Sequence, residues 1–376
     1  MSKKKVLHIG HAVGGVDVYI RQIISHINTD KFELIIAHGT DDTKENYVDK
    51  NGNSIKEYKI GISRNIHPIK DFVATMKLIS IIQNEKPDVI HAHSSKGGVL
   101  ARVASLFYKT KVLYTPNAFS FLSTSNKLKR SIFIGVEKVL KPFSILLASS
   151  YSEAKRGLNQ VGFDTSNVIV FENSVPPITE EQTQKASSIT LPEKYICSIG
   201  RPSYQKNIEE MVEVYRKVSQ KVPDVYMVLM GVGFYSPNLD NVKRLLKEYQ
   251  LENKFILIPW ISREDVFPVI KKSLLYISTA RYEGLPYSII ESLSIGKACV
   301  VSDCDGNRDL VDHAQNGFVI PEEELSDKMP DAILELIHNP ELRTQFEQQS
   351  KEKFEQRYNI YNNISKMEAI YLKYAN

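Results

Sequence analysis

The feature that most limits the folds open to this chain is an alternation of short apolar runs with longer stretches of helical periodicity. Runs that are apolar at every position, rather than at every second one, are typical of strands buried on both faces of a parallel sheet. In the first half these runs are KVLHIG (5–10), FELIIAHG (32–39), PDVIHAH (87–93), KVLYTP (111–116) and ILLASS (145–150). Helical stretches at 16–27 and 69–85 lie between them. The first half therefore predicts a doubly wound α/β sheet.

The alternation stops once, at residues 172–193, a segment rich in Pro, Ser, Thr, Glu and Gln that we interpret as a linker. It then resumes with apolar runs at 195–200, 225–231, 255–260, 274–279 and 298–303. The 376 residues suit two domains. We expect Rossmann-like domains at 1–180 and 190–355 with a ligand cleft between them, and an aromatic helix near the C-terminus that caps the second domain or crosses back to the first.

Composition narrows the function classes. A formal net charge of +4 is too small to indicate nucleic acid as a partner, although clustered cations would suit an anionic ligand or membrane surface. The apolar run after MSKKK is too short for a signal peptide, and no segment approaches a membrane span. Cys197, Cys299 and Cys304 have neither disulfide nor metal-site spacing, which favours reduced thiols. We expect a cytoplasmic protein.

Two cations follow the first apolar run of the second half, in GRPSYQKN (200–207). Arg201 and Lys206 stand between a strand and a helix, where a planar guanidinium and an ammonium are suited to a diphosphate. The alternative is a pair of solvated loop charges.

Two acids flank the start of a helix in ARYEGLPYSIIESLSIG (280–296). Pro286 suits a first helical turn, whose N–H groups at Tyr287 and Ser288 face any nearby anion. Glu283 in the preceding loop is suited to sugar hydroxyls, whereas Glu291, among apolar neighbours, is suited to a vicinal diol or a cation. The alternative is a capping acid followed by an exposed helix acid.

In combination these motifs resemble the family-4 retaining glycosyltransferases of the GT-B fold. The resemblance rests on EGLPYSIIE, with its two acids eight positions apart, and on the Arg/Lys pair of GRPSYQKN. It extends to SDCDGNRDLVDHAQNGFVIP (302–321), PDVIHAHSSKGGVLARVAS (87–105) and GGVDVYIRQI (14–23). It therefore covers nearly the whole chain.

The resemblance implies a role for each matching position. Arg201 and Lys206 bind the donor diphosphate, Glu291 binds the ribose hydroxyls, and Glu283 is a catalytic residue at the donor sugar. The main chain that helps to bind the nucleotide-sugar comes from Gly14, Gly15, Gly284, Leu285, Pro286, Tyr287 and Ser288. The helix at 356–376 packs back on the N-terminal, acceptor-binding domain. No cofactor and no metal are required, because cations and helix N-termini neutralise the leaving group.

One position departs from the family pattern. Asn117, in YTPNAFSF, stands where the family commonly has a histidine near the reacting sugar. An amide binds a hydroxyl but cannot titrate, although in retaining transfer the departing phosphate itself can take the acceptor proton. We assign Asn117 to the catalytic and acceptor side. His91 and His93 are expected on opposite faces of their strand, with the resemblance placing His93 near the acceptor and His91 in a structural role.

Two further motifs are interpreted as coincidences. GHAVGG (10–15) lacks the central glycine and the distal acid of a dinucleotide fingerprint, so we do not assign NAD binding to it. DCD (303–305) has a metal-binding form, yet it follows a buried strand of the second domain.

Residues 120–147 combine basic and apolar side chains in SFLSTSNKLKRSIFIGVEKVLKPFSILL. Two interpretations stay open: peripheral docking on anionic lipid at the inner face of the cell membrane, or an amphipathic helix buried against the sheet.

The sequence thus predicts a retaining hexosyltransferase that moves a sugar, from a UDP-sugar, to a glycan hydroxyl. We expect a lipid-linked acceptor in surface or capsular polysaccharide biosynthesis. Two alternatives stay open: a nucleotide-sugar 2-epimerase of similar architecture, and a non-catalytic nucleotide-sugar-binding subunit.

Overall fold

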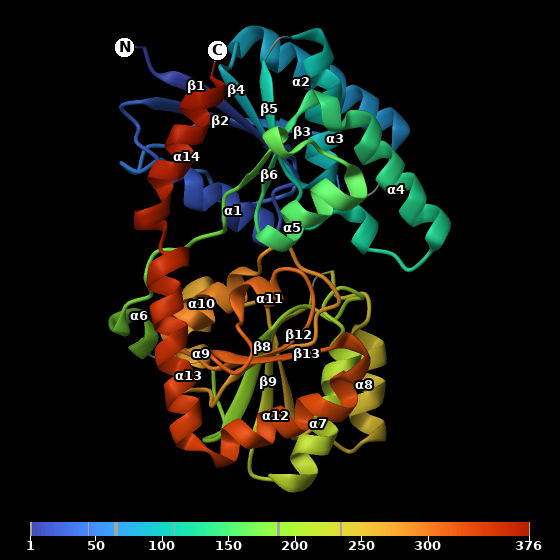
Figure 1. The fold of residues 1–376 in the computed structure, drawn as a ribbon, viewed down its shortest axis with the longest axis vertical. Helices are drawn as coiled ribbons and strands as arrows, with labels where there is room; N and C mark the ends of the chain where they lie inside the picture. The colour runs from blue at the N-terminus through green and yellow to red at the C-terminus, as the bar shows by residue number, and fades with distance from the viewer. Residues whose placement is uncertain are drawn as a thin grey trace. The chain divides into compact units, whose positions relative to one another are not determined.

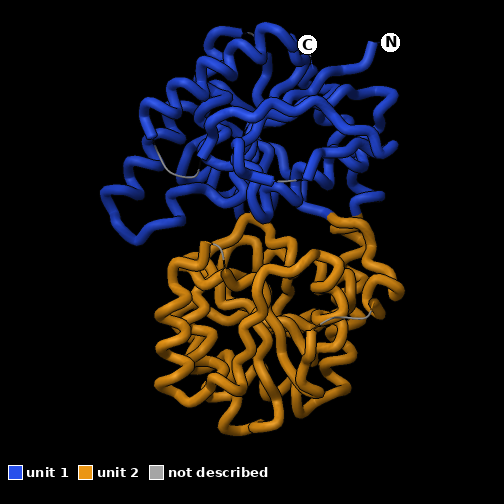
Figure 2. Tube along the Cα trace, turned by 180° about the vertical axis from the view of Figure 1, so that it is seen from behind, with its two compact units in different colours: residues 1–174, 360–376 blue, residues 175–359 orange. Residues whose placement is uncertain are grey.

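The computed structural model describes residues 2–43, 45–63, 67–108, 110–185, 189–233 and 235–375. The chain divides into two compact units (Figure 2). Unit 1 comprises Met1–Ser174 and Ile360–Asn376, and unit 2 comprises Val175–Asn359.

The first boundary falls earlier than the expected 180 because the chain after Ser174 is bonded to unit 2. Val175 N–H donates to the carbonyl oxygen of Tyr358 at 3.0 Å, and Ile178 N–H to Ser294 Oγ at 3.0 Å. The expected linker also contains a short helix, α6, capped by the side chain of Thr179. Its residues 186–188, like Asn376 of the expected C-terminal helix, lie outside the described residues.

Unit 1 contains a seven-stranded sheet in the order β3-β2-β1-β4-β5-β6-β7, with parallel pairing throughout (Figure 1). The strands are β1 (Lys4–Gly10), β2 (Phe32–Gly39), β3 (Lys56–Ile60), β4 (Val89–His93), β5 (Lys111–Thr115), β6 (Ile145–Ala148) and β7 (Val168–Val170). The helices are α1 (Gly15–Ile24), α2 (Pro68–Glu85), α3 (Ser94–Ala104), α4 (Lys127–Leu140), α5 (Tyr151–Arg156) and α14 (Ile360–Tyr374).

The two faces of this sheet are covered by different helices. Leu7 and Ile9 of β1 pack in one core with α2 and α3. The opposite face of β1 presents His8, whose ring lies against Tyr371 of the C-terminal helix α14. Helix α14, drawn in red beside the sheet in Figure 1, is thus part of unit 1.

Unit 2 contains a six-stranded parallel sheet in the order β10-β9-β8-β11-β12-β13. The strands are β8 (Tyr195–Ile199), β9 (Tyr226–Val232), β10 (Phe255–Pro259), β11 (Tyr276–Ser278), β12 (Cys299–Ser302) and β13 (Gly317–Ile320). The helices are α6 (Glu180–Gln184), α7 (Ile208–Lys221), α8 (Leu239–Glu248), α9 (Arg263–Lys272), α10 (Tyr287–Ile295), α11 (Asn307–Leu310), α12 (Leu325–His338) and α13 (Pro340–Lys353).

The prediction of two doubly wound parallel sheets is confirmed, but three strands were missed. β3, β7 and β13 all lie at sheet edges. An edge strand is only partly covered, so its sequence need not be apolar throughout. β3, with the sequence KEYKI, is an example.

Strand order also shows where each sheet can bind a ligand. Open α/β sheets bind ligands beyond the carboxyl ends of the strands, where the order of the strands reverses. In unit 1 this switch point lies between β1 and β4, and in unit 2 between β8 and β11.

Candidate functional site

The loop after β8, residues 200–207, carries both predicted phosphate-binding cations at the switch point of unit 2. A Cβ atom on Gly200 would lie 3.0 Å from Cγ and Cδ of Lys206, so glycine gives the lysine stem room to cross the strand end. Thr279, just after β11, donates its hydroxyl to the carbonyl oxygens of Lys206 at 3.2 Å and Asn207 at 2.9 Å. The loop is thereby fixed to the neighbouring strand. Arg201 is partly buried in it.

Lys206 and Glu283 form an ion pair, Nζ to Oε1, of 2.6 Å. The other carboxylate oxygen of Glu283 accepts from Gln205 Nε2 at 3.2 Å. Only 9% of the Glu283 side chain is exposed, so the lysine compensates the burial of its charge. Lys206 and Glu283 were predicted to have separate tasks, and Gln205 was not predicted as a site residue. The structure instead brings the two residues together across the switch point of unit 2.

Glu291 lies in α10, almost fully buried, and forms an ion pair with the guanidinium of Arg263. Burial raises the pKa of the Glu291 carboxyl, although the charge of Arg263 acts in the opposite direction. Arg263 is the first residue of α9, after the capping hydroxyl of Ser262. A cation at a helix N-terminus opposes the helix dipole, and this unfavourable position in SRED is the signal that could have identified Arg263.

The titration of Glu291 gives a first prediction. Its pKa is raised on folding, so folding favours the neutral carboxyl, and stability is lost as the pH rises above the unfolded value of about 4.5. Glu291→Gln removes that loss. We expect the free energy of unfolding of the variant, relative to the unmodified protein, to increase between pH 4 and pH 8 in urea titrations.

The position of Arg263 explains why the ion pair does not reverse this expectation. The arginine side chain is 34% exposed, so it stays solvated when Glu291 is neutral. If Glu291→Gln is destabilised, relative to the unmodified protein, more at pH 8 than at pH 4, then the ion pair with Arg263 stabilises the charged carboxylate by more than burial destabilises it.

The start of α10 is supported from the segment after β12. Pro286 is the N-cap residue, and its side chain makes no capping hydrogen bond. A Cβ atom on Gly306, which has φ of +77°, would lie 2.7 Å from the carbonyl oxygen of Gly284. Glycine at 306 therefore lets the main chain come close to residues 284–286.

Two side-chain hydrogen bonds hold the segments around the start of α10. Asn307 Nδ2 donates to the carbonyl oxygen of Ser302 at 3.2 Å, and the hydroxyl groups of Tyr276 and Ser288 are hydrogen-bonded at 2.9 Å.

The acids of DCD (303–305) contact one cation. Asp303 and Asp305 form ion pairs of 2.5 and 2.7 Å with Arg308.

In unit 1, Gly14 and Gly15 lie at the switch point. Gly14 has φ of +62° and precedes the first residue of α1, Gly15, and a Cβ atom on Gly14 would meet nothing within 4 Å.

Asn117 follows β5 in an unusual turn, in which Asn117 and Ala118 both have positive φ angles, 53° and 77°. Glu153 holds this turn by accepting from the N–H groups of Ala118 and Ser149, each at 2.7 Å. Asn117 Nδ2 is buried and, within the described part of the chain, has no hydrogen-bond partner. The amide nitrogen is therefore a buried donor whose hydrogen bonds are not used by the described residues.

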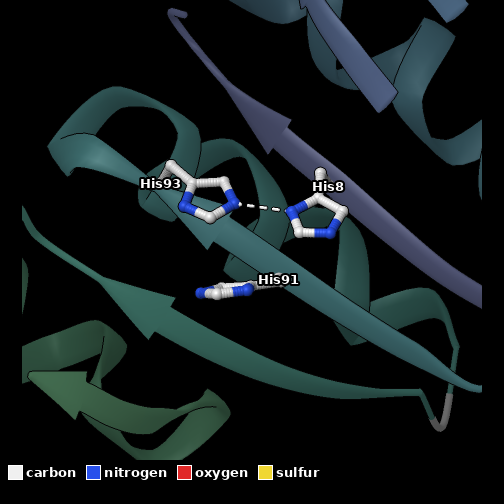
Figure 3. Close-up of side chains that lie close together, drawn as sticks. All are labelled: His8, His91 and His93. Carbon is white, nitrogen blue, oxygen red and sulfur yellow. Dashed lines mark hydrogen bonds between the residues drawn. The ribbon is translucent and has the colours of Figure 1, made fainter. Parts of the chain in front are cut away.

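The expectation that His91 and His93 face opposite sides was wrong. Residues two apart on a strand face the same side, and the two ring centroids are 4.1 Å apart. His93 Nε2 lies 2.9 Å from His8 Nδ1 (Figure 3). His91 Nδ1 lies 2.7 Å from the hydroxyl oxygen of Tyr371. All three imidazoles are fully buried, and burial lowers their pKa values, that of His8 to about 3. His93, expected on the acceptor side, is therefore a neutral core residue with no exposed surface.

Comparison with known proteins agrees with this arrangement. A family model described as Glycosyltransferase Family 4 matches residues 13–177, and one described as Glycosyl transferases group 1 matches residues 179–353. The chain is 24% identical over 385 residues to the UDP-Gal:alpha-D-GlcNAc-diphosphoundecaprenol alpha-1,3-galactosyltransferase of Escherichia coli, covering 99% of this chain and 97% of the relative. It is 27% identical over 255 residues to the Escherichia coli O-antigen biosynthesis glycosyltransferase WbnH, covering 68% of this chain and 69% of that one.

Solved structures give the same fold. Sucrose-phosphate synthase from Thermosynechococcus elongatus superposes with a TM-score of 0.84 at 15% identity, covering 99% of both chains. Anabaena HepE in complex with UDP and glucose gives a TM-score of 0.79 at 17% identity, covering 99% of this chain and 100% of HepE. The chain therefore belongs to the glycosyltransferases of the GT-B fold, with a family 4 domain followed by a group 1 domain.

Proposed function

We propose that this glycosyltransferase moves a sugar from a UDP-sugar to a hydroxyl of a lipid-linked glycan, with retention of configuration, in surface or capsular polysaccharide biosynthesis. The observation that carries the proposal is the Lys206–Glu283 ion pair beside the start of α10, at the switch point of unit 2. It is supported by the galactosyltransferase relative, whose name contains a UDP-sugar and a diphosphoundecaprenol-linked acceptor, and by the HepE complexes with UDP.

Each residue of the site has a task in this proposal. Arg201, Lys206 and the N-terminus of α10 stabilise the charge that develops on the leaving diphosphate, which removes the need for a metal. As Lys206 turns to a phosphate, the carboxylate of Glu283 becomes free to accept from the donor sugar's hydroxyls. Glu291 exchanges its contact with Arg263 for the ribose hydroxyls, and Asn117 Nδ2 donates to a hydroxyl oxygen near the reacting centre.

Two measurements test the proposal. Thermal shifts with UDP-, GDP- and ADP-sugars identify the donor, and we expect the largest shift with a UDP-sugar. The enzyme is then incubated with UDP-galactose, UDP-glucose and UDP-GlcNAc on α-D-GlcNAc-diphosphoundecyl acceptor. We expect NMR of the glycan product to show an α-anomeric linkage, and we expect one UDP to be released for each sugar transferred. A β-linkage would overturn retention.

The alternatives give different results in the same experiment. A 2-epimerase would change the donor with no acceptor present. A non-catalytic subunit would show a thermal shift with no product on any acceptor in membranes or detergent. Either result would overturn the proposed transfer.

The same proposal includes peripheral contact with anionic lipid through α4, at the cytoplasmic face of the membrane. One face of the helix packs on the core of unit 1, through Glu137 and Leu140, which are buried, and Phe133 and Ile134, which are partly buried. Its exposed face carries an apolar stripe and a set of cations, Leu128, Ile132, Val136 and Val139 with Lys127, Lys129, Arg130 and Lys138. This composition is suited to an anionic membrane surface.

Helix α2 extends that surface. It carries a second outward stripe at helical spacing, formed by Ile69, Phe72, Val73 and Met76. Helices α2 and α4 both contact α3, and the three helices are labelled around the same part of unit 1 in Figure 1. In the described part of the chain no helix has both the length and the apolar character needed to cross a bilayer, so contact of this kind would be peripheral.

Vesicle binding tests the membrane contact. Each basic side chain near an anionic surface contributes about 1 kcal/mol of binding free energy. Replacing Lys127, Lys129 and Arg130 by Gln should therefore weaken binding to phosphatidylglycerol vesicles about 100-fold. Co-sedimentation is measured against Lys217→Gln, an exposed lysine of unit 2, as the control. Equal binding of both variants would contradict the proposed contact.

A further inference from the structure

Two loops of unit 2, residues 204–207 after β8 and 279–283 after β11, are hydrogen-bonded to each other. The N–H group of Arg281 donates to the carbonyl oxygen of Gln205 at 2.8 Å. Its Nη1 donates to the carbonyl oxygen of Tyr204 at 2.7 Å. The two loops are therefore held together across the switch point of unit 2.

The side chain of Gln205 bonds the second loop in return. Its Nε2 donates to the carbonyl oxygen of Tyr282 and to Glu283 Oε2, each at 3.2 Å. A primary amide has two N–H groups, one for each of these acceptors. The other carboxylate oxygen, Glu283 Oε1, accepts from Lys206 Nζ at 2.6 Å. Among the described residues, the carboxylate of Glu283 is thus held by two neighbours in one loop.

These two partners of Glu283 respond differently to an anionic ligand. Lys206 Nζ has three protons and, within the described ranges, one acceptor, so it can turn to a phosphate. Gln205 has no charge, and both protons of its Nε2 already have acceptors in the second loop. Gln205 therefore stays with the carboxylate when the lysine turns away.

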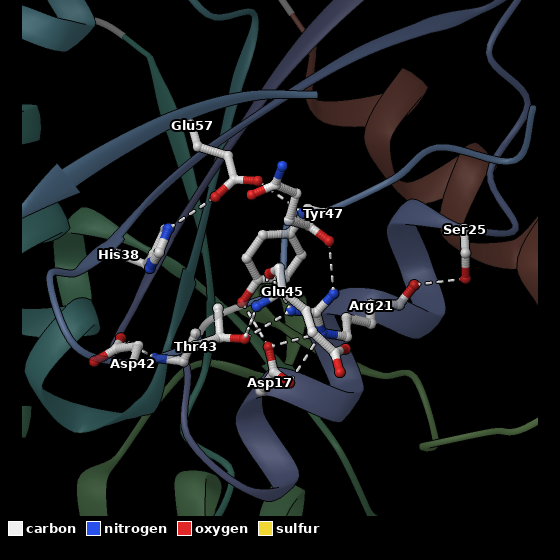
Figure 4. Close-up of polar contacts among 11 residues, drawn as sticks. Asp17, Arg21, Ser25, His38, Asp42, Thr43, Glu45, Tyr47 and Glu57 are labelled. Carbon is white, nitrogen blue, oxygen red and sulfur yellow. Dashed lines mark hydrogen bonds and ion pairs between the residues drawn. The ribbon is translucent and has the colours of Figure 1, made fainter. Parts of the chain in front are cut away.

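An acid and a cation of unit 1 show the opposite arrangement (Figure 4). Arg21 Nε donates to Asp17 Oδ2 at 3.0 Å. Its Nη1 and Nη2 donate to oxygen atoms of Thr43, Glu45 and Asn46. Every nitrogen of that guanidinium has an acceptor in the protein, so the arginine is fixed and serves the structure. Lys206 Nζ has no second acceptor of this kind in the described part of the chain.

We infer that Gln205 is the positioning residue of Glu283, which keeps the carboxylate directed at the donor sugar after Lys206 has turned to the diphosphate; this inference rests on the proposed sugar transfer. Only 9% of the Glu283 side chain is exposed. Without Gln205, donor binding would leave this buried carboxylate with the sugar hydroxyls alone, and a buried charge with few partners is costly. The sugar would then bind more weakly and in a less uniform orientation.

Binding measurements test the inference without turnover. Gln205→Ala is expected to raise the Kd of a UDP-sugar about 10-fold, the usual effect of losing a hydrogen bond to a charged group. The Kd of UDP, which has no sugar, should stay unchanged. Isothermal titration calorimetry gives both constants. Gln220→Ala, which alters an exposed glutamine of α7, is the matched control and should change neither.

Kinetics with altered donors separate a positioning role from a structural one. In Gln205→Ala we expect kcat to fall about 10-fold with the complete donor. With a series of UDP-deoxysugars, the loss caused by removing the hydroxyl that meets Glu283 should be smaller in the variant than in the unmodified enzyme. A structural role would lower transfer from every donor by the same factor. Gln205→Glu, which places a second carboxylate beside Glu283, should be impaired at least as much.

A measurement without ligand tests the same contact. Lys206→Ala imitates the state in which the lysine has left Glu283. In that background Gln205→Ala should lower the Tm by more than it does in the unmodified protein, because the buried carboxylate then loses its last partner.

Three results would overturn the inference: a Kd that is unchanged for the UDP-sugar or raised equally for UDP, an equal loss of kcat with every deoxy donor, and equal losses of Tm in the two backgrounds. An unmodified enzyme that binds a UDP-sugar and transfers no sugar would contradict the proposed function, while the Tm comparison would still decide whether Gln205 holds Glu283.

Discussion

Lys206→Ala is expected to lower the rate of sugar transfer by about 10²–10³-fold, the usual effect of removing one group that stabilises charge in a transition state. It should also destabilise unit 2, because it leaves the carboxylate of Glu283, 8% exposed, without its cation. The structure thus predicts two separate losses from one substitution. Steady-state kinetics and thermal unfolding, measured on the same preparation, record both.

A double variant separates these two losses. Lys206→Ala combined with Glu283→Gln removes the uncompensated charge, so thermal stability should recover while activity stays low. Lys217→Ala, which breaks an exposed ion pair with Asp327 in the same unit, is the matched control and should change neither. Wild-type turnover in Lys206→Ala, or recovery of activity in the double variant, would contradict the assignment of Lys206 to the leaving group.

Glu137→Ala is expected to destabilise unit 1 by about 3–5 kcal/mol, the usual cost of breaking a buried ion pair. Glu137 Oε2 accepts from Arg102 Nη1 at 2.8 Å, and its Oε1 accepts from Tyr114 OH at 2.8 Å. Arg102 has no exposed surface, and its guanidinium lies 4.1 Å from the centroid of the Tyr114 ring. Glu137 is also one of two buried residues of α4, so this network attaches the helix to the sheet beside the apolar packing of Phe133 and Ile134.

Hydrogen exchange of α4 peptides measures this effect without requiring the two units to unfold together. We expect faster exchange throughout α4 in Glu137→Ala, and exchange close to that of the unmodified protein in Lys138→Ala, which alters the exposed neighbour. Replacing both partners, as Arg102→Met with Glu137→Leu, should restore much of the protection, because no buried charge is left unpaired. Slow exchange in Glu137→Ala would contradict the role of the network.

The core of the fold could be predicted because strands buried on both faces must be apolar at every position. This condition identified the central strands around both switch points and failed for β3, whose charged residues are acceptable at an edge. The positions of Arg201 and Lys206 after a strand could be predicted for the same reason. Strand order, which defines the switch points, depends on the pairing of whole elements, and no local pattern of residues reveals it.

Pairings within the site were harder to predict than positions. Lys206 and Glu283 are 77 residues apart, and their contact arises only because β8 and β11 are neighbours in the sheet. The same holds for Glu291 and Arg263, because Arg263 follows another strand, β10. His91 and His93 are a different case. Residues two apart on a strand face the same side of the sheet, so the sequence alone already places both rings on one face, and the prediction of opposite faces misapplied this rule.

The contact between His91 and Tyr371 has a consequence for the order in which this protein folds during synthesis. Domains generally fold as units as they emerge from the ribosome, the N-terminal one first. Here the face of the first sheet that holds His91 is covered by Tyr371 and Met367 of α14, both fully buried and within the last residues of the chain. Unit 1 therefore begins to be translated first, but its core needs Ile360–Tyr374, which follow all of unit 2 in the sequence. The first half of the chain thus depends on a helix that is synthesised only after the second half.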